Sequence, residues 1–156
     1  MGGLLKHMAV FARVSVAALA LAGIRVQAAE TPAACTKEDF ETVVEEAAGH
    51  LRDLNAKNRP IFQEKLRQLR DKRHWSHDAF IENAKPFVKD GNTAVYDQKT
   101  DELLSAIASM GQEGAADETP DCALMQDLRA RMKMLVETQS AKWSYMFKKL
   151  DAELAN

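Results

Sequence analysis

The sequence predicts an all-α protein, a mostly antiparallel bundle of about five helices with a long C-terminal helix and one disulfide. The chain has 156 residues but only 7 glycines and 4 prolines, too few for the many turns of a β-sandwich. No segment alternates apolar and polar residues over a useful length, as a half-buried strand would. Apolar residues recur instead at three- and four-residue steps, the spacing of one face of a helix.

Residues 1–28 are predicted to be a secretory signal peptide. Lys6 and Arg13 supply positive charge, and no acidic residue occurs before Glu30. The apolar run 14–22 is nine residues long. That length suits a signal peptide and is far short of the roughly 20 residues that span a bilayer.

The sequence Val26-Gln27-Ala28 fits the small-residue rule for cleavage after Ala28. The mature chain is therefore expected to begin at Ala29 and to form a single helical domain, 29–156, in the periplasm or outside the cell. After cleavage no stretch remains that could cross a membrane. Two alternatives stay open, an initiator at Met8 and an uncleaved N-terminal anchor.

The first helix is predicted over 37–56, because Thr36 can cap its start and an apolar stripe follows. Asn58-Arg59-Pro60 then predicts a turn, since proline disrupts a helix interior but suits the first position of a new helix. The second helix is therefore expected over 60–73.

Ser76 predicts the start of a third helix, which Pro86 should end or kink. Asp90-Gly91-Asn92 predicts a turn. A fourth helix is expected over 94–110, with Thr100 as an alternative start.

Residues 111–117 are expected to form a flexible loop before the last helix. Thr119-Pro120-Asp121 offers a cap, a proline at the first helical position and an acidic first turn. One face then stays apolar for over seven turns, without glycine or proline up to Leu154. A helix of this length measures about 50 Å. It should outreach its shorter partners, so that its C-terminal part projects or meets something else.

Cys35 and Cys122 are the only cysteines. An even pair in an exported chain predicts a disulfide. The bridge would close a loop of about 88 residues, worth at most roughly 4.6 kcal/mol of stability. The alternative, a redox-active pair, normally has the spacing Cys-x-x-Cys, which is absent.

The end of the last helix carries a large apolar stripe, which we interpret as a candidate interaction surface. Its residues are Trp143, Tyr145, Met146, Phe147 and Leu150. Lysines flank the stripe, as suits a helix that docks in a partner's groove, on an anionic surface or on a second copy. In the alternative, other helices fold over the stripe and complete an ordinary core.

A weaker candidate is a metal site at Asp71, His74 and His77, which would share one face of a continuous helix. A helix start at Ser76 would break that face, and the alternative is a polar connector. The basic run 57–73 has a local charge of +5 and the segment 30–53 a charge of −5. We expect these segments to pair along a helical hairpin, or the basic run to bind an anionic partner.

The function classes follow mainly by exclusion. The sequence contains no nucleotide-binding, nucleophile-elbow or zinc-protease motif and no motif for a cofactor. Without the three basic residues of the leader the net charge is −5, which disfavours nucleic-acid binding. We therefore expect a non-enzymatic binding protein of the cell envelope whose partner is an unidentified protein or envelope component. The alternative is a metal-binding or stress-related envelope protein that uses His74 and His77.

Overall fold

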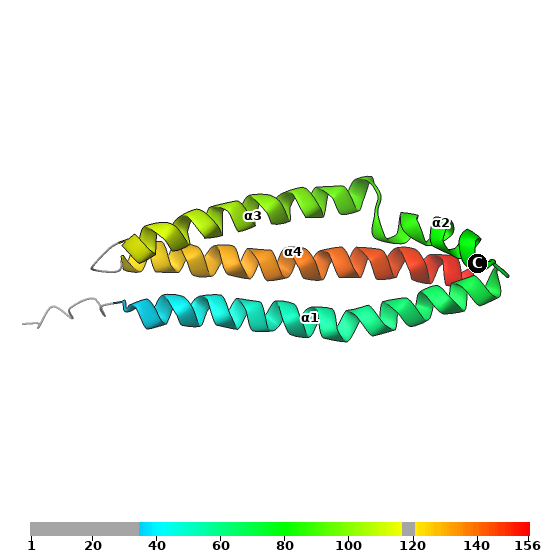
Figure 1. The fold of residues 1–156 in the computed structure, drawn as a ribbon, viewed down its shortest axis with the longest axis horizontal. Helices are drawn as coiled ribbons and strands as arrows, with labels where there is room; N and C mark the ends of the chain where they lie inside the picture. Colours follow the sequence, from blue (N-terminus) through cyan, green and yellow to red (C-terminus); the bar gives the residue numbers. More distant parts are fainter. Residues whose placement is uncertain (1–34, 117–120) are drawn as a thin grey trace, which may run out of the picture. The chain divides into compact units, whose positions relative to one another are not determined.

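The computed structural model describes residues 35–116 and 121–156, and within them every regular element is an α-helix (Figure 1). The helices are α1 (Lys37–Lys72), α2 (His77–Val88), α3 (Gly91–Ala116) and α4 (Cys122–Ala155). The predicted all-α class is confirmed, with four helices in these ranges in place of about five. The predicted leader, residues 1–28, and the expected cap at Thr119 lie outside the described residues.

Helix α1 begins as predicted, with Thr36 as its cap. The Thr36 hydroxyl accepts a hydrogen bond from the Asp39 N–H (3.2 Å), and the Asp39 carboxylate accepts one from the Thr36 N–H (2.8 Å). This reciprocal pair satisfies two backbone donors that the first turn would otherwise leave unpaired.

The predicted turn at Asn58-Arg59-Pro60 is wrong, because α1, which is 36 residues long, continues through Pro60. The Pro60 ring lies on the exposed side of the helix, away from the core. Residues of α1 are buried in the core on both sides of Pro60, for example Ala47 before it and Phe62 after it. We attribute the continuity to this burial, since tertiary packing outweighs the roughly 3 kcal/mol that an interior proline costs a helix.

Helix α2 starts at the predicted cap, where the Ser76 hydroxyl accepts a hydrogen bond from the Ala79 N–H (3.3 Å). Pro86 does not end α2, which runs two residues further to Val88. Helix α3 is longer than predicted at both ends. It starts at Gly91 instead of 94, and residues 111–116, expected as a flexible loop, are its last turns.

Helix α4 is capped by Asp121, whose carboxylate accepts a hydrogen bond from the Ala123 N–H (2.7 Å). It contains 34 residues, against 36 in the unbroken α1. The expectation that the last helix outreaches its partners is therefore wrong, because α1 has nearly the same length.

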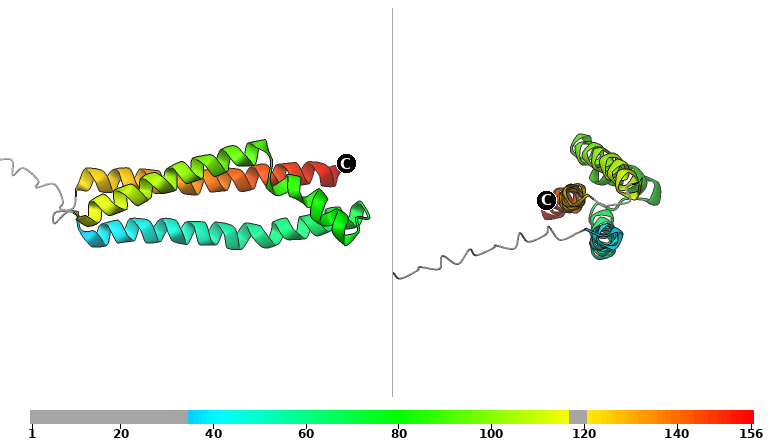
Figure 2. Two further views of the ribbon diagram at one scale, coloured as in Figure 1. Left: turned by 45° about the horizontal axis from the view of Figure 1, so that its top comes forward. Right: turned by 90° about the vertical axis from the view of Figure 1, so that its left-hand side faces the viewer.

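Helix α4 packs against both α1 and α3, and α2 covers its C-terminal part. Helices α1 and α4 run in the same direction and α3 runs oppositely (Figure 1). Seen along the helices, α1, α3 and α4 are three separate columns (Figure 2). The disulfide joins Cys35 to Cys122, so the predicted pairing is confirmed and it links the starts of the two parallel helices.

Two apolar clusters form the core, one at each end of the helices. The first, near the disulfide, contains Val43, Ala47, Met110, Met125, Leu128 and Met132. The second, near the end of α4, contains Phe62, Leu66, Leu69, Phe87, Met146 and Leu150.

Candidate binding groove

The apolar stripe at the end of α4, expected as a candidate interaction surface, packs against α1 and α2 in the structure. Met146 and Leu150 are buried, Leu150 completely (0% exposed). Trp143, Tyr145 and Phe147 are half-buried and pack against the same cluster. The cover comes from the second half of α1 and from α2, because the unbroken α1 reaches this end of α4.

Edge-to-face contacts between aromatic rings orient the side chains of this cluster. The Phe62 ring lies 5.8 Å from the Trp143 ring and 5.5 Å from the Phe147 ring, both edge-on. The Trp143 Nε1–H donates to Asn55 Oδ1 at 3.1 Å. Edge-on aromatic contacts and a partnered indole are typical of a packed interior.

The structure does not assemble the candidate metal site. Asp71 lies in the last turn of α1, His74 in the connection and His77 at the first position of α2. The backbone of His74 has a φ of 53°, the left-handed conformation that ends a helix. No shared helical face therefore exists. In 35–116 and 121–156, no group of three histidine, cysteine or acidic residues is placed to hold a metal ion.

The basic run at the end of α1 pairs with the end of α4, which corrects the expected pairing with segment 30–53. Lys65 lies 2.6 Å from Asp151, and Arg73 lies 3.1 Å from Glu153. The Lys72 ammonium donates to the carbonyl of Leu154 (2.8 Å), one of the last in α4. The acidic residues at the start of α1 therefore do not face the basic run.

A hollow of about 540 Å³ opens at that acidic end, between α1 and α3 with α4 beneath. Its lining is Lys37, Phe40, Glu41, Val44, Glu45, Gly111, Gly114 and Leu128. Val44 keeps 42% of its surface exposed, although its neighbour Val43 is buried in the core. The hollow therefore presents apolar surface to its surroundings.

Two glycines of α3 shape this hollow. A Cβ on Gly114 would lie 3.0 Å from Phe40 Cε1, so the phenyl ring of Phe40 rests on a residue without a side chain. A Cβ on Gly111 would meet nothing within 4 Å. Gly111 thus leaves open space that a larger residue would fill.

A second hollow, of about 240 Å³, lies farther along α4. It has Asn55 of α1 on one side, Val88 of α2 on the other, and Gln139, Lys142, Trp143 and Met146 of α4. Leu128, Gln139 and Met146 fall on one stripe of α4, because their spacings of 11 and 7 residues are close to whole helical turns. The two hollows therefore lie along one face of α4, whose side chains between them are buried (Leu135 is 3% exposed). We call the first hollow with its walls on α1 and α3 the groove.

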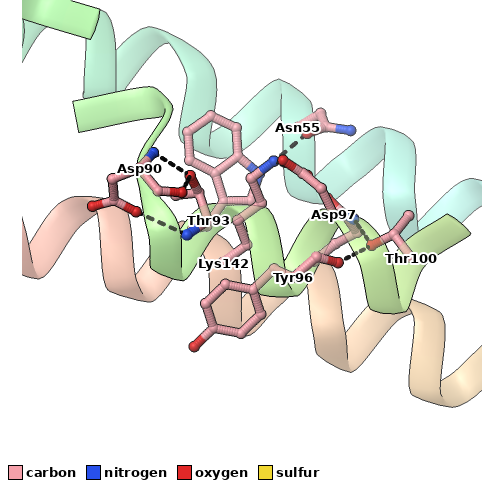
Figure 3. A network of polar contacts seen from close by, with 9 residues as sticks. Asn55, Asp90, Thr93, Tyr96, Asp97, Thr100 and Lys142 are labelled. Atoms are coloured by element: carbon pink, nitrogen blue, oxygen red, sulfur yellow. Dashed lines mark hydrogen bonds and ion pairs between the residues drawn. The ribbon is translucent and has the colours of Figure 1, made fainter. Parts of the chain in front are cut away.

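Polar contacts join α3 to α4 at the second hollow (Figure 3). Gln139 Nε2 donates to Thr100 Oγ1 (2.7 Å), which donates to the Tyr96 carbonyl (2.8 Å). Lys142 forms an ion pair with Asp97. Thr100, considered as a helix start from the sequence, is thus an interior residue that fixes α3 on α4.

Asp90 fixes the junction of α2 and α3 on α4. It accepts hydrogen bonds from Lys149 Nζ (2.6 Å), the Thr93 N–H (2.8 Å) and the Tyr145 hydroxyl (2.7 Å). The Lys149 hydrogen bond, followed by those from Thr93 and Tyr145, holds the pKa of Asp90 well below its usual range. The Thr93 hydroxyl in turn accepts a hydrogen bond from the Asp90 N–H (2.7 Å). Asp90, which was predicted to lie in a turn, therefore caps the start of α3 and bonds to Tyr145 and Lys149 of α4.

The walls of the groove are acidic. Residues 37–56 of α1 contain six acidic and two basic residues, and α3 contains four acidic and one basic. A shallow depression on α1 adjoins the first hollow and is lined by Glu38, Glu41, Thr42, Glu45 and Glu46. We call the four glutamates the acidic shelf; Glu41 and Glu45 belong to both the shelf and the hollow.

No protein-family model, curated protein or solved structure matches the chain. Among the helices of the described ranges, none combines the length and apolar character of a membrane span. The first hollow is lined by apolar side chains, glycines, carboxylates and one lysine. These groups can bind and orient an apolar segment, and they include no serine, cysteine or histidine that could act as a nucleophile.

Sequence analysis missed the residues of this groove. Gly111 and Gly114 fall in the segment expected as a flexible loop, and Phe40 and Val44 fall in the apolar stripe predicted over 37–56. One signal was available, because Val43 and Val44 are adjacent and a helix directs neighbouring side chains about 100° apart. Both could not enter the same narrow core.

Proposed function

We propose that the protein is a non-enzymatic binding protein of the periplasm or the secreted fraction, whose groove takes an amphipathic helix of a partner. The observation that supports this most directly is the apolar hollow beside the half-exposed Val44 (42%). Concave apolar surface on a soluble protein is typical of binding sites. Export depends on the leader predicted over 1–28, with cleavage after Ala28.

A helix suits the groove better than an extended strand. The α3 and α1 walls are helices whose backbone groups bond internally, so they offer no sheet edge for strand addition. On α1 the lining of the groove runs from Lys37 to Glu45, a rise of about 12 Å along the helix. A partner helix would therefore seat two to three of its turns in the groove.

A photo-crosslinking residue in place of Val44 tests the proposal in producing cells. We expect it to capture a segment with apolar residues at helical spacing, identified by sequencing the crosslinked peptide. Gly111→Leu should abolish capture, because a side chain there would extend into the hollow from a Cβ that meets nothing within 4 Å. Gly91→Leu is the matched control, since Gly91 also has nothing within 4 Å of an added Cβ but lies outside the lining. Equal capture by both variants would contradict the proposal.

The export half of the proposal has its own test. Intact mass of the protein recovered from the periplasm or medium should correspond to a chain that begins at Ala29. A species that retains residues 1–28 would overturn this localisation, while leaving the binding groove to be judged on the crosslinking result.

A further inference from the structure

We infer that the helix taken by the groove is cationic, with lysine or arginine beside its apolar face that pairs with the acidic shelf. The inference rests on the proposed function, because it assigns a partner chemistry to the same groove. The acidic shelf and the apolar hollow are contiguous through Glu41 and Glu45. A single ligand in the hollow would therefore contact both surfaces.

The shelf carboxylates have few cations of their own. Glu45 pairs with Arg52 at 2.5 Å, and both side chains are mostly exposed, so this pair contributes little. Within 35–116 and 121–156, Glu41 and Glu46 form no ion pair. In the lining of the hollow, Lys37 is the one positive charge beside Glu41 and Glu45, whereas Glu46 also shares a depression with Arg129 and Lys133. The local field at the hollow therefore remains negative.

The spacing of these residues places like charges together. Glu38, Glu41 and Glu45 follow one another at steps of three and four, which makes them neighbours on the surface of α1. Like charges at these steps disfavour an isolated helix by a few tenths of a kcal/mol per pair. A cationic ligand would relieve this repulsion, whereas an anionic ligand would increase it.

Helix α3, on the opposite side of the hollow, also has a net negative charge. It carries four acidic residues and only Lys99 as a base, and the Asp97 carboxylate is already paired with Lys142 of α4. A helix lying between α1 and α3 would thus meet carboxylates on the α1 side, whereas α3 contributes only Gly111 and Gly114 to the lining and no cation. Complementary charge on the ligand would speed association and set its orientation.

Three labelled 18-residue peptides test the inference by fluorescence anisotropy with the protein purified from producing cells. All three share a leucine face at helical spacing and differ only in the flanking residues, which are lysine, glutamine or glutamate. We expect the lysine peptide to bind about tenfold more tightly than the glutamine peptide at low salt, the glutamate peptide to bind weakest, and the preference to shrink with added salt.

Variants of the protein separate charge from shape. Glu41→Gln with Glu45→Gln keeps the size of the lining and should bring the lysine peptide to the affinity of the glutamine peptide. The control pair, Asp78→Asn with Glu82→Gln, removes two exposed carboxylates of α2 outside the groove and should leave the preference unchanged. Circular dichroism would verify that both pairs remain folded.

The outcomes distinguish the two proposals. Equal affinity for the three peptides, abolished by Gly111→Leu, would retain the groove and overturn the cationic partner. A lysine preference that Gly111→Leu leaves intact would overturn the groove as the site. Binding of none of the peptides would overturn both proposals. Dimerisation of the protein that Gly111→Leu prevents would assign the groove to a second copy and overturn the cationic helix.

Discussion

At the scale of single residues, Trp143 connects the aromatic cluster to the wall of α1. It packs edge-on to Phe62 and donates to Asn55 across 88 positions of sequence. Trp143→Ala should lower the free energy of unfolding by about 3 kcal/mol, the low end for a core tryptophan, because the ring is half-buried. Urea denaturation followed by circular dichroism measures this loss.

Trp143→Phe is the matched variant for this prediction. It keeps an aromatic ring against Phe62 and removes the hydrogen bond to Asn55, so we expect a loss of about 1 kcal/mol. If Trp143→Ala left stability nearly unchanged but abolished self-association, the tryptophan would lie at an interface and not in the core.

Asp90 links stability to pH at the same scale. Its folded pKa lies below its ordinary value, so its contribution is present above the unfolded pKa of about 3.9 and is lost as pH falls through the folded pKa. We expect Asp90→Asn to lower the melting temperature at pH 7. The difference from wild type should shrink as pH falls below about 4, because the unfolded wild-type chain then binds a proton at this carboxyl that folding must release.

Asp101→Asn is the control for the Asp90 prediction, since Asp101 is exposed and takes no part in the contacts with Tyr145 and Lys149. It should change the melting temperature little at any pH. A deficit in Asp90→Asn that stayed constant from pH 7 to pH 3 would mean that shape, and not charge, holds the junction.

At the scale of elements, α1 contains a proline that weakens it locally. Pro60 lacks the N–H that would donate to the carbonyl of Ala56, and its ring is exposed. Pro60→Ala should raise the free energy of unfolding by about 2 kcal/mol. An interior proline costs about 3 kcal/mol, and greater freedom of the unfolded chain offsets part of the gain.

Gln63→Ala, another exposed position of α1 one turn away, should change stability by less than about 0.5 kcal/mol. Comparison of the two variants in urea isolates the effect of the proline from that of adding alanine. If Pro60→Ala destabilised the protein, the helix would depend on the proline geometry, and the continuous α1 would be in doubt.

At the scale of the whole molecule, the disulfide holds the starts of α1 and α4 beside the first core cluster, against which Cys35 packs. Cys35→Ser with Cys122→Ser should lower the free energy of unfolding by up to about 4.6 kcal/mol, because the open chain regains entropy over 87 positions of sequence. Hydrogen exchange should accelerate most in the first turns of both helices and least in the second cluster.

Added reductant should lower the stability of the wild type to that of the double variant and leave the double variant unchanged. Two freely labelled thiols in the denatured, unreduced wild type would contradict the disulfide. Equal acceleration of exchange in both clusters would contradict their separation along the helices.

Much of the fold follows from local chemistry or from counting. Thr36 and Ser76 mark helix starts because a hydroxyl at a cap bonds within its own first turn. Two cysteines allow one internal pairing, which is the one observed. The ends of α3 were misjudged, because Gly91 and Gly111 disfavour a helix locally while burial of Leu103 and Met110 favours it.

The sequence by itself determined the all-α class, two of the caps and the disulfide, since each depends on neighbouring residues or on a count. Only the tertiary structure decided that α1 passes through Pro60, that Trp143 packs against α1, and that an apolar hollow opens beside Glu41 and Glu45. These features depend on which surfaces meet, as between Lys65 and Asp151 or Asn55 and Trp143. Periodicity identifies an apolar face on each helix, but burial of that face depends on the length and direction of helices far away in sequence.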